Sequence, residues 1–383
     1  MIVQENRTFD DLFNGFRGAD TVRVGLKHDG TQQTLTAIKL DPTKDWPHSH
    51  SAWLTDYDNG KMDGWDIVKL QSGTLTGTGP YTYVRTADTV PYWTMATQYT
   101  LGDRMFQSNT GPSYPAHLYL IAGQALSTIS NPGFAPWGCD TPGQTTGTIL
   151  PSGKTGPKIS TCFDVPTIGD LMDTAGVSWR YYAPAVGMAG VQWSAYDSIK
   201  HIRFGTDWSR DVISPETSVI TDIQDGILAN VTYVTPNSQN SDHGGDSKLP
   251  YGPAWVASIV DAVGNSQFWN STAIFVVWDD FGGYYDHVAP LREDYMGLGG
   301  RVPLLVISPY AKHGYVSHVQ HEFGSILRFI EETFGLPSLG TTDARSDDFA
   351  DCFDFTQNPP AFSNIPHGTF APDVMWQPAP DND

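Results

Sequence analysis

Positive charge is scarce in this chain, whose 383 residues include 22 Lys and Arg against 42 Asp and Glu, for a formal net charge of -20. A chain this acidic gains little electrostatic attraction to a phosphate backbone or to an anionic membrane surface. We therefore expect no nucleic-acid partner. Charged residues make up only 17% and aromatic residues reach 12%, which is typical of a chain that folds around a core and not of a disordered acidic segment.

Long hydrophobic runs and a secretory leader are also missing. The longest apolar runs, 273–278 and 304–307, have the length of buried strands and not the roughly 18 residues that span a bilayer. We therefore expect no transmembrane segment. The chain opens on Met1-Ile2-Val3-Gln4 without a signal peptide, so that either a signal was removed or the given start is late.

Cysteine is rare, and Cys139, Cys162 and Cys352 show no spacing typical of a metal site. Cys139 and Cys162 bracket a segment rich in Gly, Ser, Thr and Pro, where a disulfide would contribute about 3 kcal/mol to stability. Three unpaired buried thiols are the alternative, and composition alone does not separate the two. Low charge, abundant Trp and a loop suited to a crosslink favour an exported protein, secreted or periplasmic.

Strand and helix patterns alternate along the chain. We expect helices over 117–122, 167–172, 220–228, 254–263 and 325–334, and strands over 2–3, 177–182, 231–234, 273–278 and 302–308. The last two strands are continuous apolar runs, which we interpret as buried strands of parallel type. The alternation predicts an α/β fold with three layers, a mostly parallel central sheet with helices on both faces.

No linker or internal repeat divides the chain, so we expect a single domain over residues 1–383. Residues 126–166 are rich in turn residues and lack sustained periodicity, which indicates a long ordered loop. Residues 355–383 form a Pro-rich tail that we expect to pack as irregular structure.

Acidic residues follow two of the expected strands. Glu5-Asn6 follows the first strand, and Asp279-Asp280 follows the strand over 273–278. Ligands bind beyond the carboxyl ends of strands in open α/β sheets, and acids buried there need neutralisation. A divalent cation such as Mg²⁺, Ca²⁺ or Mn²⁺ would provide it, since hard ions prefer oxygen ligands. The alternative is a solvated strand end whose acids cap the next loop.

Ser113 lies in a Gly- and Pro-rich turn over residues 109–117 that leads into a helix. A helix N-terminus attracts phosphate through its backbone N–H groups and dipole, and a serine near a cation becomes a better nucleophile. The alternative is that Ser113 only caps the helix. His48, His243 and His287 are candidates for contacting phosphate or protonating a leaving group, although single histidines are more often structural.

Together these segments resemble the bacterial phosphoesterase family of phospholipases C and acid phosphatases, to which plant non-specific phospholipases C also belong. This family is part of the alkaline-phosphatase-like superfamily. The resemblance rests on an ordered set of segments that covers nearly the whole chain, namely 5–10, 47–65, 111–117, 241–243, 279–288, 300–310 and 325–331. It implies an alkaline-phosphatase-like fold and a phosphoric ester substrate.

The resemblance also implies roles by position. Five residues match the ligands of one divalent metal ion: Glu5, Asn6, Ser113, Asp279 and Asp280. Ser113 matches the family's nucleophile, and His243 matches a histidine that contacts phosphate where two-metal relatives have a metal ligand. His48 matches a further active-site histidine, with His50 two residues away. We expect Ca²⁺, Mg²⁺ or Mn²⁺ at the site, with Zn²⁺ also possible there.

The sequence departs from the family pattern at three places. The mid-chain histidine pair of some family phosphatases has only His201 as a nearby counterpart. The first strand is short, and the large β-rich C-terminal extension of many bacterial phospholipases C is missing from these 383 residues. The resemblance thus predicts a metal-dependent hydrolase that acts through a phosphoseryl intermediate, with phosphomonoesters as the leading substrates. Phospholipid diester cleavage and an inactive binding or scaffold protein on the same fold are the alternatives.

Overall fold

A nine-stranded sheet forms the centre of the protein, whose computed structural model describes residues 1–40, 45–245 and 250–371. The strand order is β10-β9-β11-β1-β12-β13-β6-β14, and β15 also pairs with β6. The strands are β1 (Ile2–Gln4), β6 (Thr100–Phe106), β9 (Trp179–Tyr182), β10 (Val212–Ile213), β11 (Val231–Val234), β12 (Ile274–Trp278), β13 (Arg301–Ile307), β14 (Tyr315–Ser317) and β15 (His321–Glu322). All the pairings in this sheet are parallel except those that β13 makes with β12 and β6.

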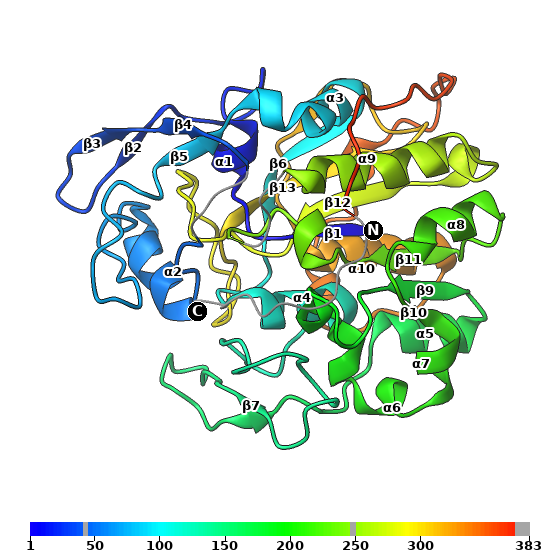
Figure 1. Ribbon diagram of the computed structural model, residues 1–383, viewed down its shortest axis with the longest axis horizontal. Helices are drawn as coiled ribbons and strands as arrows, with labels where there is room; N and C mark the ends of the chain where they lie inside the picture. Colours follow the sequence, from blue (N-terminus) through cyan, green and yellow to red (C-terminus); the bar gives the residue numbers. More distant parts are fainter. Residues whose placement is uncertain (41–44, 246–249, 372–383) are drawn as a thin grey trace.

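Helices cover both faces of the sheet (Figure 1). One face carries α3 (Val90–Gln98), α8 (Ser218–Gln224) and α9 (Tyr251–Gly264), and the other carries α4 (Ser113–Ala122), α5 (Ile168–Ala175) and α10 (Phe323–Phe334). The expected three-layer α/β fold with a mostly parallel sheet is confirmed. Shorter helices are α1 (Phe9–Phe13), α2 (His50–Tyr57), α6 (Lys200–Arg203) and α7 (Thr206–Asp211). Small two-stranded sheets join β2 (Val24–Leu26) to β3 (Gln32–Thr34), β4 (Thr36–Ile38) to β5 (Thr82–Val84), and β7 (Thr145–Thr146) to β8 (Ile159–Ser160).

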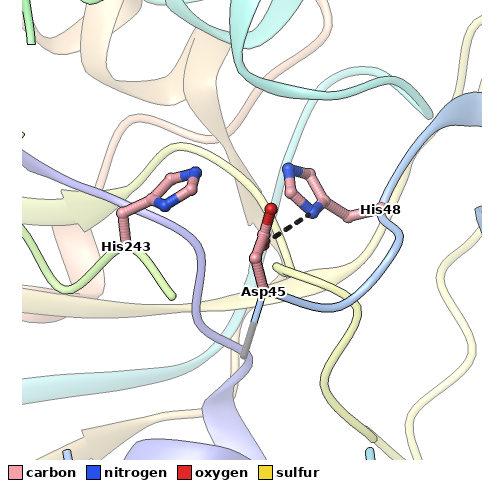
Figure 2. A group of neighbouring side chains, drawn as sticks. All are labelled: Asp45, His48 and His243. Atoms are coloured by element: carbon pink, nitrogen blue, oxygen red, sulfur yellow. Dashed lines mark ion pairs between the residues drawn. The ribbon is translucent and has the colours of Figure 1, made fainter. Parts of the chain in front are cut away.

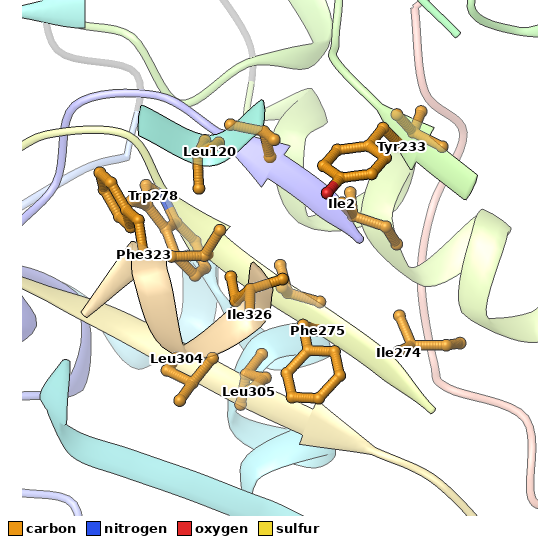
Figure 3. Packing of buried hydrophobic residues seen from close by; sticks show 14 of the residues in the cluster. Ile2, Leu120, Tyr233, Ile274, Phe275, Trp278, Leu304, Leu305, Phe323 and Ile326 are labelled. Atoms are coloured by element: carbon orange, nitrogen blue, oxygen red, sulfur yellow. The ribbon is translucent and has the colours of Figure 1, made fainter. Parts of the chain in front are cut away.

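Local sequence signals set the helix ends. Helix α5 begins after Thr167, whose side chain forms a capping box with Asp170, and ends at Gly176 in the left-handed conformation. Helix α10 ends in the same way at Gly335. Its apolar face packs on the sheet, where Ile326 lies over the side chains of β12 and β13 (Figure 3). The helices expected over 167–172 and 325–334 are therefore confirmed within a few residues.

The prediction of a parallel strand over 302–308 is wrong, because β13 runs antiparallel to both of its neighbours. Burial on both faces gives a continuous apolar run whatever the direction of the strand. The segment 279–300 between β12 and β13 contains no helix, and a connection without a crossover joins antiparallel neighbours. Pro303, which has no N–H to donate, lies where the register shifts between Val302 and Leu304.

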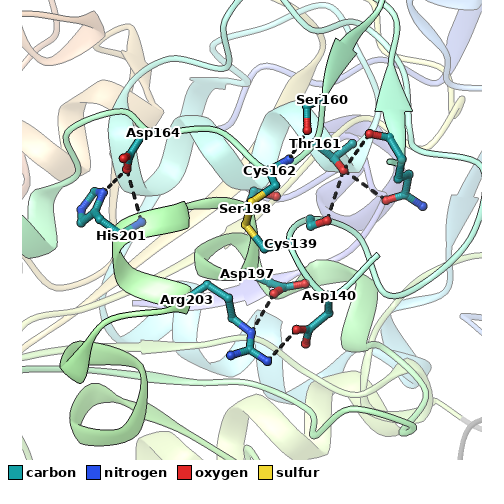
Figure 4. The surroundings of a disulfide bond; sticks show 12 residues. Cys139, Asp140, Ser160, Thr161, Cys162, Asp164, Asp197, Ser198, His201 and Arg203 are labelled. Atoms are coloured by element: carbon teal, nitrogen blue, oxygen red, sulfur yellow. Dashed lines mark hydrogen bonds and ion pairs between the residues drawn. A yellow bond between two sulfur atoms is a disulfide. The ribbon is translucent and has the colours of Figure 1, made fainter. Parts of the chain in front are cut away.

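The long loop over 126–166 contains only the short strands β7 and β8, and a disulfide joins Cys139 to Cys162 within it (Figure 4). Of the two alternatives for Cys139 and Cys162, the structure shows the disulfide, and Cys352 is a free buried cysteine. Residues 355–371 of the expected irregular tail contain neither helix nor strand, and 372–383 lie outside the described residues. None of the described helices is long and apolar enough to cross a membrane.

Candidate active site

Parallel pairing of β1 and β12 brings the two acidic strand ends together. Gln4 pairs with Trp278, so the residues that follow, Glu5 and Asp279, leave the sheet at the same level. The backbone N–H of Asn6 donates to Asp279 Oδ1 over 2.9 Å. Asn6 adopts a left-handed backbone with φ of 56°, a conformation that asparagine tolerates better than most residues. The two acidic strand ends, which are more than 270 residues apart in the sequence, therefore lie next to each other at one end of the sheet.

Ser113, the first residue of α4, also contacts this group of acids. Its hydroxyl donates to Asp280 Oδ2 over 3.3 Å. The backbone of the next residue, Tyr114, donates to Asn131 Oδ1, which ties the start of α4 to the 126–166 loop. The side chain of Ser113 therefore faces the acids, and its backbone lies at a helix N-terminus, where an anion is stabilised.

The donor set at this edge fits a hard divalent cation. The predicted ligands Glu5, Asn6, Asp279 and Asp280 are 0% exposed, and three carboxylates buried at neighbouring strand ends require positive charge to offset their desolvation. Asn6 Nδ2 is engaged by His48 Nε2 at 3.0 Å, which leaves its carbonyl oxygen for another partner. Asn6 Oδ1 and Asp279 Oδ2 are buried and make no hydrogen bond to any part of the chain that the structure describes.

His117 also belongs to this cluster, and our interpretation of the sequence assigned it no role. Its Nε2 donates to Glu5 Oε1 over 2.9 Å and lies 3.7 Å from Asp279 Oδ2. Burial lowers the pKa of His117 to about 4, so that the ring is neutral and Nε2–H is the donor. The signal was present in the sequence, because residues four apart on a helix share one face and His117 is four residues after Ser113.

His48 and His243 lie close to Asp45 (Figure 2). His48 Nδ1 lies 2.7 Å from the carbonyl of Trp46, and Nε2 is 3.8 Å from Asp280 Oδ2. His243 Nδ1 is 2.9 Å from the carbonyl of Gly244, and the two rings meet edge to face with centroids 6.2 Å apart. Two imidazoles from separate segments of the chain thus lie side by side, and His48 connects the pair to Asn6 and Asp280.

The structure places His287 in a different cluster. Its Nδ1 lies 2.6 Å from Asp10 Oδ2 and its Nε2 lies 3.0 Å from Asp20 Oδ1, so carboxylates engage both ring nitrogens. The neighbouring Asp286 pairs with the buried Arg301 at 3.0 Å. Burial alone would lower the pKa of His287, but the hydrogen bond and charge of Asp10 raise it above its ordinary value. This environment favours a charged histidine that holds segments together.

Two other histidines considered from the sequence also have clear positions. His50 Nδ1 lies 2.8 Å from Thr110 Oγ1 and so contacts the turn that precedes Ser113. His201 pairs with Asp164 and with Asp170, beside the disulfide on the outer part of the molecule (Figure 4). His201 is therefore engaged in surface ion pairs, and of the neighbouring His48 and His50 it is His48 that contacts Asn6 and lies near Asp280.

A comparison with protein families agrees with this fold and with the cluster of acids around Ser113. A model of the phosphoesterase family matches residues 1–337, and the chain belongs to that family.

The relatives of this chain are named for two activities, phospholipase C and acid phosphatase. The chain is 25% identical to the non-hemolytic phospholipase C of Pseudomonas aeruginosa over 88% of its own length and 53% of that protein's length. It is 26% identical to phospholipase C B of Mycobacterium tuberculosis, over 96% and 79% of the two lengths. It is also 26% identical to an acid phosphatase of Aspergillus fumigatus, over 47% and 42%. The chain thus spans about half the length of the Pseudomonas relative.

Solved structures show a weaker likeness. A Vibrio parahaemolyticus protein of the alkaline phosphatase superfamily gives a TM-score of 0.42 at 10% identity, with 67% of this chain and 64% of that chain covered. Human ectonucleotide pyrophosphatase/phosphodiesterase 5 gives 0.43 at 10% identity, with 70% and 94% covered. Scores at this level carry no argument about function.

Proposed function

We propose that this protein hydrolyses phosphoric esters with a divalent metal ion and Ser113 as nucleophile. The observation that carries the proposal is the convergence of the Ser113 hydroxyl with acids from two adjacent strand ends. A single ion held there would neutralise negative charge on the phosphate oxygens and beside the serine hydroxyl. Its proposed ligands are Glu5, Asn6, Ser113, Asp279 and Asp280, and Ca²⁺, Mg²⁺ or Mn²⁺ suits this oxygen-rich set.

The protein's own groups can carry the proton movements of such a reaction. Ser113 Oγ forms the new bond to phosphorus as its proton moves toward Asp280 Oδ2, the oxygen to which it already donates. The bond between phosphorus and the ester oxygen breaks, and a histidine protonates the departing oxygen. We assign this work and the contact with phosphate oxygens to His48 and His243. Water then hydrolyses the phosphoserine, which releases phosphate and restores the serine.

We assign His287 a supporting place in this scheme and not a contact with substrate. It lies with Asp10 and Asp20 in a cluster that contains neither Ser113 nor the proposed metal ligands. The scheme treats residues 1–383 as one catalytic domain. The disulfide between Cys139 and Cys162 supports export of this domain, secreted or periplasmic, because disulfides persist in oxidising compartments.

The names of the relatives support two substrate classes. We propose phosphomonoesters, such as an aryl phosphate, as the main substrates, with phospholipid diesters as the second candidate. The phospholipase C names come from relatives matched over 88% and 96% of this chain, which is the observation that favours the diester. An inactive scaffold on the same fold is the third reading, and the named site residues are all present.

A side-by-side assay tests this proposal. We expect hydrolysis of an aryl phosphate that is lost after chelation and restored by Mn²⁺, Mg²⁺ or Ca²⁺. The phosphorylcholine diester of the same aryl alcohol is the matched substrate. A preference of tenfold or more for the diester, about 1.4 kcal/mol in transition-state binding, would make phospholipids the main substrates. No hydrolysis of either ester with any of the three ions would contradict the proposed activity.

A further inference from the structure

A second group of metal-type ligands lies at the β14 edge of the sheet and shares no residue with the candidate active site. His321 in β15, Asp351 and Cys352 each offer one ligand atom, and these atoms lie within 4.8 Å of one another. His321 and Cys352 are 0% exposed. Asp351 and Cys352 come from the short 3₁₀ turn Ala350–Cys352, which packs against β14. We propose that His321, Asp351 and Cys352 bind a Zn²⁺ ion that stabilises this edge of the fold.

The spacing of the ligand atoms is close to that of a tetrahedral zinc site. Asp351 Oδ1 lies 3.5 Å from Cys352 Sγ and 3.8 Å from His321 Nε2. Bonds of about 2.0 Å to oxygen and nitrogen and about 2.3 Å to sulfur place neighbouring ligand atoms of a tetrahedron roughly 3.3–3.6 Å apart. The two distances from Asp351 Oδ1 are thus within about 0.5 Å of tetrahedral spacing, and all three ligand atoms lie within 4.8 Å of one another.

The surroundings orient the ligands as the supports of a metal site do. His321 Nδ1 lies 2.9 Å from Asp347 Oδ1, and a carboxylate on the far nitrogen is the usual support of a metal-bound histidine. The other oxygen of Asp351, Oδ2, accepts hydrogen bonds from Ser317 at 2.5 Å and Tyr315 at 3.2 Å. These bonds leave Oδ1 facing the sulfur and the imidazole. Ser317 Oγ also lies 3.1 Å from His321 Nε2, so that it or a water can fill the fourth position.

The charge and the chemical type of the ligand atoms determine which ion this site prefers. Asp347 and Asp351 bring two carboxylates to a buried imidazole and a buried thiol. Cys352 Sγ donates to Asp351 Oδ1 over 3.5 Å, so the sulfur carries a proton that an ion must displace. Binding breaks the S–H bond, forms the metal–sulfur bond and releases the proton to solvent. A donor set of one sulfur, one imidazole and one carboxylate suits Zn²⁺ and not Ca²⁺ or Mg²⁺.

Cobalt absorption tests this site separately from the catalytic one. Cys139 and Cys162 are joined, so Cys352 is the one cysteine of the three that can give a thiolate-to-Co²⁺ charge-transfer band. The full chain, treated with a chelator and then titrated with Co²⁺ alone, should develop this band and saturate it by two equivalents, because the emptied candidate active site can also take up Co²⁺. Two equivalents of Zn²⁺ should remove the band.

Three variants complete the experiment. Cys352→Ser should show no band, and His321→Gln should need at least tenfold more Co²⁺ to reach it. Glu5→Gln, which changes only the candidate active site, should keep the wild-type band even if its hydrolytic activity is lost. Absence of the band in the wild-type chain would overturn the proposal, as would a wild-type titration in His321→Gln. Activity plays no part in this readout, so the zinc site and the proposed function stand or fall separately.

Discussion

Replacement of His117 by alanine should weaken metal binding at the candidate active site. His117 Nε2 donates to Glu5 Oε1 over 2.9 Å, and both side chains are nearly or fully buried. Removal of a donor to a buried charged group costs about 1.5–3 kcal/mol. Loss of the residue that orients a metal ligand typically reduces affinity 10- to 100-fold, or about 1.4–2.8 kcal/mol. The two magnitudes agree, so we expect a metal dissociation constant raised by one to two orders of magnitude.

Calorimetric titration of chelator-treated protein with Mn²⁺ measures this effect directly. His117→Gln retains an N–H donor and should recover part of the affinity, which a purely structural role for the ring would not predict. His50→Gln is the matched control, because His50 is also buried and contacts Thr110 in place of the acids. It should bind Mn²⁺ as the wild type does. Unchanged affinity in a folded His117→Ala variant would refute the argument that His117 positions Glu5.

Two further predictions concern stability. The raised pKa of His287 means that its ion pairs with Asp10 and Asp20 stabilise the fold fully below about pH 6.5 and lose this effect as the pH rises through the folded pKa. His287→Gln should therefore lower the unfolding free energy by about 1.5–3 kcal/mol near pH 6 and by less near pH 9. Thermal melts in which the difference between wild type and variant is the same at both pH values would contradict this assignment. Reduction of the disulfide between Cys139 and Cys162, which are 23 residues apart, should cost about 3 kcal/mol, and thiol titration of the unfolded, unreduced chain should give one thiol. A count of three thiols would show that the bond does not form.

The sequence predicted where the acids of the candidate site lie because strand ends are local features. Acids directly after an apolar run must emerge at the end of that strand, and parallel neighbours bring such ends together. Glu5 and Asp279 follow this rule, and β1 and β12 are indeed direct partners. His48 and Ser113 were placed by resemblance, and their contacts with Asn6 and Asp280 agree with that placement.

The missed features depend on contacts that local patterns do not encode. Strand β6 was not expected because Asp103 and Arg104 interrupt its apolar pattern, yet Asp103 is buried against His318. The direction of β13 depends on the connection that precedes it and not on its own residues. The role of His117 depends both on the face of α4 on which it lies and on the position of Glu5, and a local sequence pattern gives only the first of these.

The most direct test of the proposed mechanism is trapping of the phosphoserine. Wild-type protein mixed with an aryl phosphate and quenched in acid should yield a phosphorylated peptide that contains Ser113. Ser113→Ala should lose turnover by orders of magnitude with an unchanged melting temperature. Ser258→Ala is the matched control, because Ser258 bonds only to the carbonyl of Ala254 within α9 among the described contacts, and it should turn over normally. Near-normal turnover in Ser113→Ala, or a phosphate trapped on another residue, would contradict the assignment of Ser113 as the nucleophile.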